Sequence, residues 1–184
     1  MKNQLSILSL DLGGSLGWAR NIITLKPDVT INVADHGTIY LDDLATDRMK
    51  KDHNEVLNRH RVRIMIFEEA IRKLINVVKF DGYVVEDVFM MPQRVGAFRS
   101  LAIYMDVLER IINFEKQKQL HALPPTIIKQ LMTKNGLSDK LEVQQAILSN
   151  RSITVKNPNS MTSHESDAIA CCFAYVHGYL LAPL

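Results

Sequence analysis

The sequence predicts an α/β fold in which helices flank a mixed β-sheet. Three observations lead to this prediction. Short segments of strand character, separated by turn residues, occupy the beginning of the chain. Longer segments with apolar residues at helical spacing follow, and short apolar segments lie between them. Strands first, and then strands that alternate with helices, are typical of a layered α/β domain.

The first three expected strands form an antiparallel meander. A short, mostly apolar run ends at Asp11, which indicates a buried strand. Glycines at positions 13, 14 and 17 then mark a tight turn. A second turn is expected around residues 26–28. The three strands are predicted at residues 5–10, 18–25 and 30–41.

Helices alternate with short strands in the rest of the chain, after a polar segment, residues 42–53, that is expected to be irregular. Thr162 and Glu165 have the spacing of a capping box, which marks the start of the last helix. The second helix carries an apolar stripe that is either core or a surface for a partner helix: Leu101, Met105, Leu108 and Ile112. Helices are predicted at residues 54–79, 97–119, from 124 onward, 139–149 and 163–181, and strands at 83–85 and 121–123.

The composition indicates one globular domain, residues 1–184. Apolar residues make up 47% and charged residues 23% of the chain, as in ordinary soluble proteins. The net charge of +2 is too small to identify a nucleic-acid binder. Cys171 and Cys172 are adjacent and have no CxxC spacing, so we expect reduced core residues. Since neither a signal peptide nor an apolar run of roughly 18 residues is apparent, we expect a cytoplasmic protein without a membrane contact.

Three acidic residues stand where such a fold places ligands. Asp11 ends the first expected strand and Glu86 ends the fourth. Asp167 lies in the first turn of the last helix, three residues after His164, so these two side chains can share a helix face. Strand ends are the usual binding edge of open α/β sheets. We therefore expect these side chains to meet.

Carboxylates from separate elements are what metal-dependent phosphodiester hydrolysis needs. Two Mg²⁺ ions about 4 Å apart can activate water and stabilise the leaving oxygen, and Mg²⁺ prefers carboxylate oxygens. Each acid also has a purely structural interpretation. Asp11 could cap the glycine turn, and Glu86 could be an ordinary strand-end acid. Asp167 could interact favourably with the positive end of the helix dipole. Glu165 is assigned to the capping box and not to the metal. The metal interpretation depends on all of them occurring together and in this order.

Three segments resemble the motifs of the RuvC Holliday-junction resolvases. Residues 11–18, DLGGSLGW, resemble the first motif, and residues 85–90, VEDVFM, resemble the second acidic motif. Residues 164–168, HESDA, resemble the final motif, in which some members carry histidine and others aspartate at the position of His164. Residues 128–130 and 136–144 also look like segments of this family.

This resemblance implies a ribonuclease H-like fold and a homodimer that nicks two opposed strands of a four-way DNA junction. It also favours part of the second helix at the dimer interface. The implied metal ligands, for two Mg²⁺ or Mn²⁺ ions per active site, are Asp11, Glu86, His164 and Asp167. Lys140 and Lys129 would contact phosphates, with Lys140 also stabilising the reacting one. Phe89 would stack on an unpaired base, unless it is a core aromatic. Basic residues near the start of the long helix are either further DNA contacts or a solvated helix face: Arg59, Arg61 and Arg63.

The chain departs from the family in two respects. Its residues 41–57 form a longer segment than in the bacterial enzymes, and its net charge is low for a junction binder. Both bear on junction selectivity more than on nuclease chemistry, and a divergent or phage-encoded member, acting in a bacterial cell or an infected host, would fit. Three alternatives stay open: a broader nuclease for flaps and forks, a non-catalytic DNA-binding scaffold, and an ATP-binding domain of the actin and sugar-kinase class. The last would need a second Asp-x-Gly turn after a strand, which we do not find.

Overall fold

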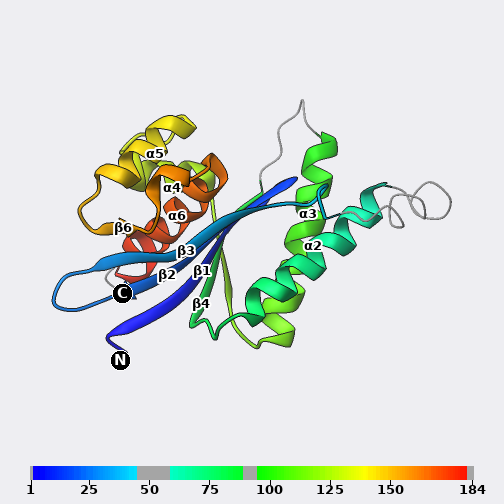
Figure 1. Ribbon diagram of the computed structural model, residues 1–184, viewed down its shortest axis with the longest axis horizontal. Helices are drawn as coiled ribbons and strands as arrows, with labels where there is room; N and C mark the ends of the chain where they lie inside the picture. The colour runs from blue at the N-terminus through cyan, green and yellow to red at the C-terminus, as the bar shows by residue number, and fades with distance from the viewer. Residues whose placement is uncertain (1, 45–58, 89–94, 182–184) are drawn as a thin grey trace.

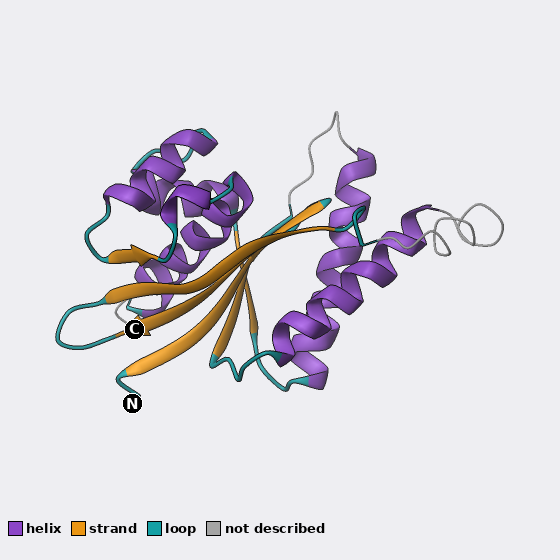
Figure 2. Ribbon diagram, in the orientation of Figure 1, coloured by secondary structure: helices purple, strands orange, loops and turns teal. Residues whose placement is uncertain are grey.

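The fold is a six-stranded sheet with helices on both faces (Figures 1 and 2). This computed structural model describes residues 2–44, 59–88 and 95–181. The strands lie in the order β5-β4-β1-β2-β3-β6. Helices α4, α5 and α6 cover one face, and α2 and α3 cover the other. The predicted α/β class, with a mixed sheet, is confirmed.

The predicted antiparallel meander is also confirmed. It consists of β1 (Gln4–Asp11), β2 (Ser15–Thr24) and β3 (Thr30–Tyr40). Strand β2 begins three residues earlier than expected, because Gly17 pairs with Asp11 and extends the ladder to the end of β1. The glycine turn is correspondingly shorter.

Three strands join the meander in parallel. The two predicted ones, β4 (Gly82–Glu86) and β5 (Leu120–Leu123), extend the sheet from β1. A third, β6 (Ile153–Val155), pairs with β3 and was not predicted. Its three residues include one buried side chain, which is too short a pattern to indicate a strand.

The helices match the predicted order, and their ends differ from the predicted ones by a few residues. They are α2 (Arg59–Asn76), α3 (Val95–Glu109), α4 (Pro125–Thr133), α5 (Lys140–Ser149) and α6 (Ser163–Tyr175). Helices α3 and α6 each continue into a π-helical turn, at Arg110–Glu115 and Val176–Leu180. The second helix ends before the predicted residue 119, since Gln117 takes a left-handed conformation with φ 52°. Pro158–Ser160 form a 3₁₀ turn. The predicted start of the first long helix at residue 54 lies outside the described residues.

Each face of the sheet has its own apolar core. On β1, Ile7 faces α6, whereas Leu8 and Leu10 face α2 and α3. The apolar stripe of α3 belongs to the second core: Met105, Leu108 and Ile112 are buried there and Leu101 packs against them. Of the two alternatives left open for the stripe, its three buried side chains are therefore core. Cys171 and Cys172 are buried free thiols, as predicted.

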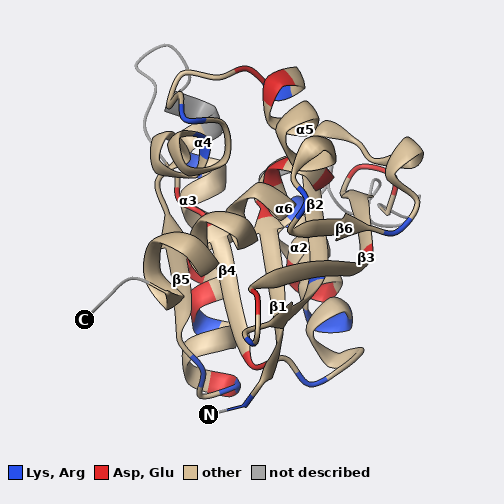
Figure 3. Ribbon diagram, turned by 90° about the vertical axis from the view of Figure 1, so that its left-hand side faces the viewer, with Lys and Arg blue, Asp and Glu red and all other residues tan. Residues whose placement is uncertain are grey.

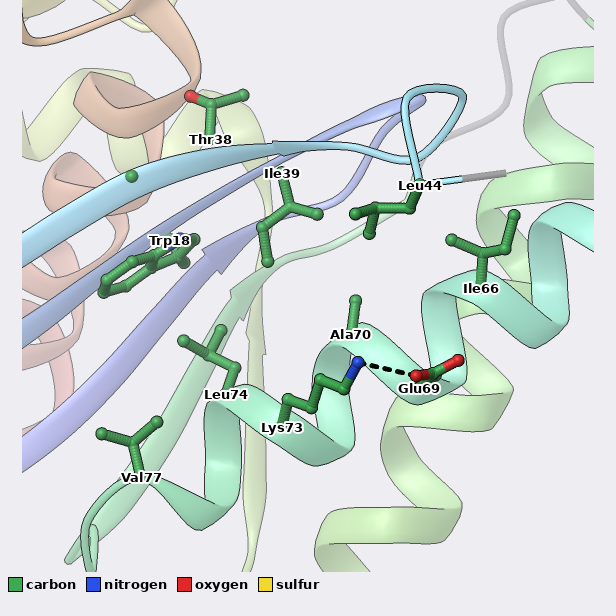
Figure 4. A pocket seen from close by; sticks show the side chains of 11 residues that line it. Trp18, Thr38, Ile39, Leu44, Ile66, Glu69, Ala70, Lys73, Leu74 and Val77 are labelled. Atoms are coloured by element: carbon green, nitrogen blue, oxygen red, sulfur yellow. Dashed lines mark ion pairs between the residues drawn. The ribbon is translucent and has the colours of Figure 1, made fainter. Parts of the chain in front are cut away.

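An apolar groove of about 740 Å³ separates β3 from α2 (Figure 4). Trp18, Ile39 and Leu74 line it, and Lys73 pairs with Glu69 along its side. None of the predicted metal ligands contributes to this groove. Over the described parts of the chain, no helix combines the length and apolarity that a bilayer crossing requires.

Candidate active site

Asp11 and Glu86 are neighbours at one edge of the sheet. Each is the last residue of its strand, β1 for Asp11 and β4 for Glu86. These strands are parallel, and the register pairs Leu10 with Val85, so the next residue of each strand emerges at the same edge. In open α/β sheets, this carboxyl edge is where ligands bind. The structure therefore brings the first two predicted ligands together.

The first turn of α6 adds His164 to this edge. Thr162 caps the helix and forms the predicted capping box with Glu165. The His164 Nδ1 atom lies 2.8 Å from Asp11 Oδ2. Asp167 lies one turn further along, with a side chain that is 13% exposed. The last helix thus carries two of the predicted ligands to the ends of β1 and β4.

Gly17 permits this close approach of helix and sheet. A Cβ atom at Gly17 would lie 2.2 Å from the carbonyl oxygen of His164. Any side chain there would have to push the first turn of α6 away from β2. Glycine inside a strand often marks such a close backbone approach.

Burial and nearby negative charges raise the pKa values of Glu86 and Asp167. Burial raises the pKa of Glu86 to about 8, and the negative charges of Asp11 and Asp167 add to the effect, while Lys129 and Lys140 oppose it. Burial also raises the pKa of Asp167, with the charge of Asp11 as the second cause. The carboxyl group of Asp11 is therefore close enough to disfavour the ionisation of both Glu86 and Asp167.

Lys140 forms an ion pair with one of these acids. Its Nζ atom lies 3.0 Å from Asp167 Oδ2. Burial lowers the pKa of Lys140, but the charges of Asp167, Asp11 and Glu86 outweigh burial, so that the pKa is raised. The side chain is 55% exposed, so its ammonium group remains accessible to a phosphate. Lys129, on α4, adds positive charge near Glu86.

The donor set suits a divalent cation. As the side chains stand, no group of three or more His, Cys, Asp or Glu residues in the described ranges could hold an ion. Instead, Asp11 pairs with His164, and Asp167 pairs with Lys140. A cation among these carboxyl groups would remove their repulsion, and carboxylate oxygens are ligands that Mg²⁺ and Mn²⁺ prefer. The residues fit a divalent cation if the two pairs open to admit it.

Known proteins were compared with this chain at the levels of sequence and structure. No protein-family model and no curated protein sequence matches it. Solved structures do match. Thermus thermophilus RuvC superposes with a TM-score of 0.70 at 16% identity, covering 98% of this chain and 100% of its own. The chain has the RuvC fold.

Two further structures agree with this fold. T. thermophilus RuvC in complex with a Holliday junction substrate gives a TM-score of 0.68 at 15% identity, covering 94% of this chain and 93% of its own. The yeast mitochondrial Holliday junction resolvase, Ydc2, gives a TM-score of 0.57 at 12% identity, covering 92% of this chain and 78% of its own. The ribonuclease H-like fold predicted from the resemblance to RuvC resolvases is confirmed.

Within this RuvC fold, the predicted basic contacts divide into two groups. Lys129 and Lys140 lie on α4 and α5, on the same side of the sheet as α6. The three arginines lie on α2, across the sheet. Of these, Arg63 forms a two-pronged ion pair with Asp42, Arg61 is exposed, and the side chain of Arg59 is outside the description. Figure 3, which faces the α4–α6 side, shows basic positions interspersed with acidic ones. Phe89 also lies outside the described residues.

Sequence reasoning missed two side chains that hold α6 in the RuvC fold. His36 and Thr38, on β3, both contact the buried carboxyl group of Glu165. Their alternate positions put them on one face of β3, which the period of a strand could have indicated. Which element they meet across that face is a property of the tertiary structure.

Proposed function

We propose that this protein is a metal-dependent endonuclease of the RuvC type, which resolves four-way DNA junctions by paired nicks as a homodimer. One observation carries the proposal. The acids Asp11, Glu86 and Asp167, from three separate elements, converge at the carboxyl edge of a sheet whose fold matches RuvC over 98% of this chain. Since the matched structures include a RuvC bound to a Holliday junction substrate, a junction is the first substrate to test.

The four side chains around the edge share one proposed role, which is to bind metal. Asp11, Glu86, His164 and Asp167 would hold Mg²⁺ or Mn²⁺, with two ions per site. Such ions, when bound, activate water and stabilise the charge that develops on phosphate oxygens. Glu86 would release its proton as a cation binds, because metal ligands must be deprotonated.

Lys140 and Lys129 would act on the DNA. The exposed ammonium group of Lys140, held near Asp167, is suited to a phosphate at the site, where a preoriented positive charge stabilises the transition state. Lys129 would neutralise a neighbouring phosphate. Phe89 lies outside the described residues and keeps its predicted role of stacking on an unpaired base.

A homodimer would match the two-fold symmetry of a four-way junction. Each of the two subunits would then place its own set of acids at one of the two opposed strands. Met105, Leu108 and Ile112 of α3 are buried against their own sheet, so the contact between subunits is expected at exposed side chains.

The decisive experiment is cleavage of a mobile four-way junction in Mg²⁺ and in Mn²⁺. Asp11→Asn, Glu86→Gln and Asp167→Asn should each nearly abolish cleavage and leave junction binding largely intact, because phosphate contacts dominate affinity. Asp106→Asn, at an exposed acid on α3, is the matched control and should cut like wild type. An Asp11→Asn variant with near wild-type activity would refute the proposal.

The same assay separates the alternatives. Equal cleavage of flaps, forks and junctions would identify a broader branched-DNA nuclease. Junction binding without cleavage in either metal would identify a non-catalytic scaffold. The described residues form a single six-stranded sheet and not two related halves, which disfavours an ATP-binding domain of the actin and sugar-kinase class.

A further inference from the structure

We infer that His36 is a positioning residue for the metal site, acting through Glu165 on the first turn of α6. The inference rests on the proposed function, and it concerns residues that the nuclease chemistry does not itself use. His36 lies on β3, and its side chain is 7% exposed, as is that of Glu165. Neither residue belongs to the predicted metal ligands.

His36 holds two segments of the chain with its two ring nitrogens. Its Nε2–H donates to the carbonyl oxygen of Lys156, 2.7 Å away, and its Nδ1 lies 2.5 Å from Glu165 Oε2. Lys156 directly follows β6, whereas Glu165 is in the first turn of α6. The imidazole therefore links both ends of the connection between β6 and α6.

Thr38 completes this link from the same face of β3. Its hydroxyl donates to Glu165 Oε1 at 2.9 Å and lies 2.7 Å from the hydroxyl of Thr162, the N-cap of α6. Figure 4 shows Thr38 turned away from the groove side chains of Ile39 and Leu74. We call His36, Thr38, Thr162 and Glu165 the α6 clasp.

The clasp controls the ligands because of where Glu165 stands in α6. His164 directly precedes Glu165, and Asp167 follows it by two residues. Successive helix residues point in directions about 100° apart, so one turn can hold Glu165 against β3 and the ligands toward β1 and β4. A buried carboxylate that loses a partner must find another or move. Loss of His36 should therefore displace the first turn of α6 and both ligands with it.

The test is Mn²⁺ binding to the metal-free protein, followed by electron paramagnetic resonance without DNA. His36→Ala should weaken Mn²⁺ binding about 10-fold to 100-fold, the usual effect of losing a residue that orients metal ligands. His36→Gln keeps a side-chain amide that can donate to Lys156 or Glu165, and should recover part of the loss. Thr38→Val, which removes only the hydroxyl contacts, should weaken binding less but in the same direction.

His121→Ala is the matched control. His121 is a part-buried histidine that contacts Tyr175, at the other end of the same helix. This variant should lose packing without changing Mn²⁺ affinity more than about twofold. In all variants junction affinity without metal should be unchanged, and in His36→Ala kcat should fall while KM for the junction stays constant.

The outcomes separate the two ideas. If wild type binds Mn²⁺ and cuts junctions, and His36→Ala and Thr38→Val bind Mn²⁺ equally well, the positioning role is wrong and the proposed function stands. Equal losses in His36→Ala and His121→Ala would also refute positioning, because general loosening of α6 would explain both. If wild type binds no Mn²⁺, the proposed function fails, and the positioning role fails with it.

Discussion

Glu86 should destabilise the metal-free protein at neutral and alkaline pH, and Glu86→Gln should remove this cost. Burial, with the charges of Asp11 and Asp167, raises the pKa of Glu86 to about 8 from an ordinary value of 4.5. The folded state therefore keeps this proton over a pH range in which the unfolded state has lost it. Stability falls with rising pH wherever the folded state binds more protons.

The magnitude follows from the two pKa values. Below pH 4.5 both states are protonated and Glu86 costs nothing. The cost then grows with pH and is complete above about pH 8. Each pKa unit corresponds to about 1.4 kcal/mol, so the full difference is about 5 kcal/mol. Local relaxation and water entry will reduce it, and we expect about 2–5 kcal/mol at about pH 9.

Urea unfolding in the presence of a chelator, followed by circular dichroism, measures this effect. Glu86→Gln should be more stable than wild type by about 2–5 kcal/mol at about pH 9, and nearly equal to it at about pH 5. Glu109→Gln, at an exposed glutamate of α3, makes the same chemical change away from the site and should not alter the pH dependence. Mn²⁺ should then stabilise wild type more than Glu86→Gln, because a ligand that binds only the folded state raises its stability.

Two results would refute this reasoning. A Glu86→Gln variant that is less stable than wild type at both pH values would mean that the carboxylate is favourably solvated or paired. A stability difference independent of pH would mean that the substitution changes packing and not ionisation.

Three further predictions concern geometry, metal choice and DNA contact. Gly17→Ala should lower kcat about 100-fold, because its Cβ atom would meet the His164 carbonyl group. Gly14→Ala is the control and should retain activity, because a Cβ atom there has no neighbour within 4 Å. Equal rates for the two variants would contradict this prediction. His164→Asp should keep cleavage but move the metal preference from Mn²⁺ toward Mg²⁺, since imidazole suits transition metals better than carboxylate does. If His164→Ala cut as fast as wild type with both metals, His164 would not be a metal ligand. In salt titrations of junction binding, Lys140→Ala should reduce the slope of log affinity against log salt concentration by about one. An unchanged slope would mean that Lys140 does not contact a phosphate. Arg63→Ala should leave the slope unchanged, because this guanidinium group is already paired within the chain.

The positions of the acids could be predicted because local signals mark them. Asp11 follows an apolar run and precedes glycines, and Glu86 follows a short apolar strand, so both strand ends are visible in the sequence. The start of α6 is equally local, because a capping box acts within one helical turn. Since parallel strands share a carboxyl edge, these local boundaries were sufficient to predict that the acids converge.

Contacts between distant segments could not be predicted in the same way. The apolar stripe of α3 was compatible with a core or a partner surface, and only packing against the sheet showed that it is core. Strand β6 forms because the edge of β3 is available for pairing. Its three residues are too few to predict a strand from the sequence. The ion pair between Arg63 and Asp42 likewise joins two segments that no local pattern in the sequence connects.

The α6 clasp shows the physical reason for this division. His36 and Glu165 are 129 positions apart, and neither has a local pattern that points to the other. Hydrogen bonds in turns and caps depend on neighbours in the sequence, so their residue types reveal them. A buried hydrogen bond between β3 and α6 depends instead on how the helix lies on the sheet, which the packing of the whole core determines.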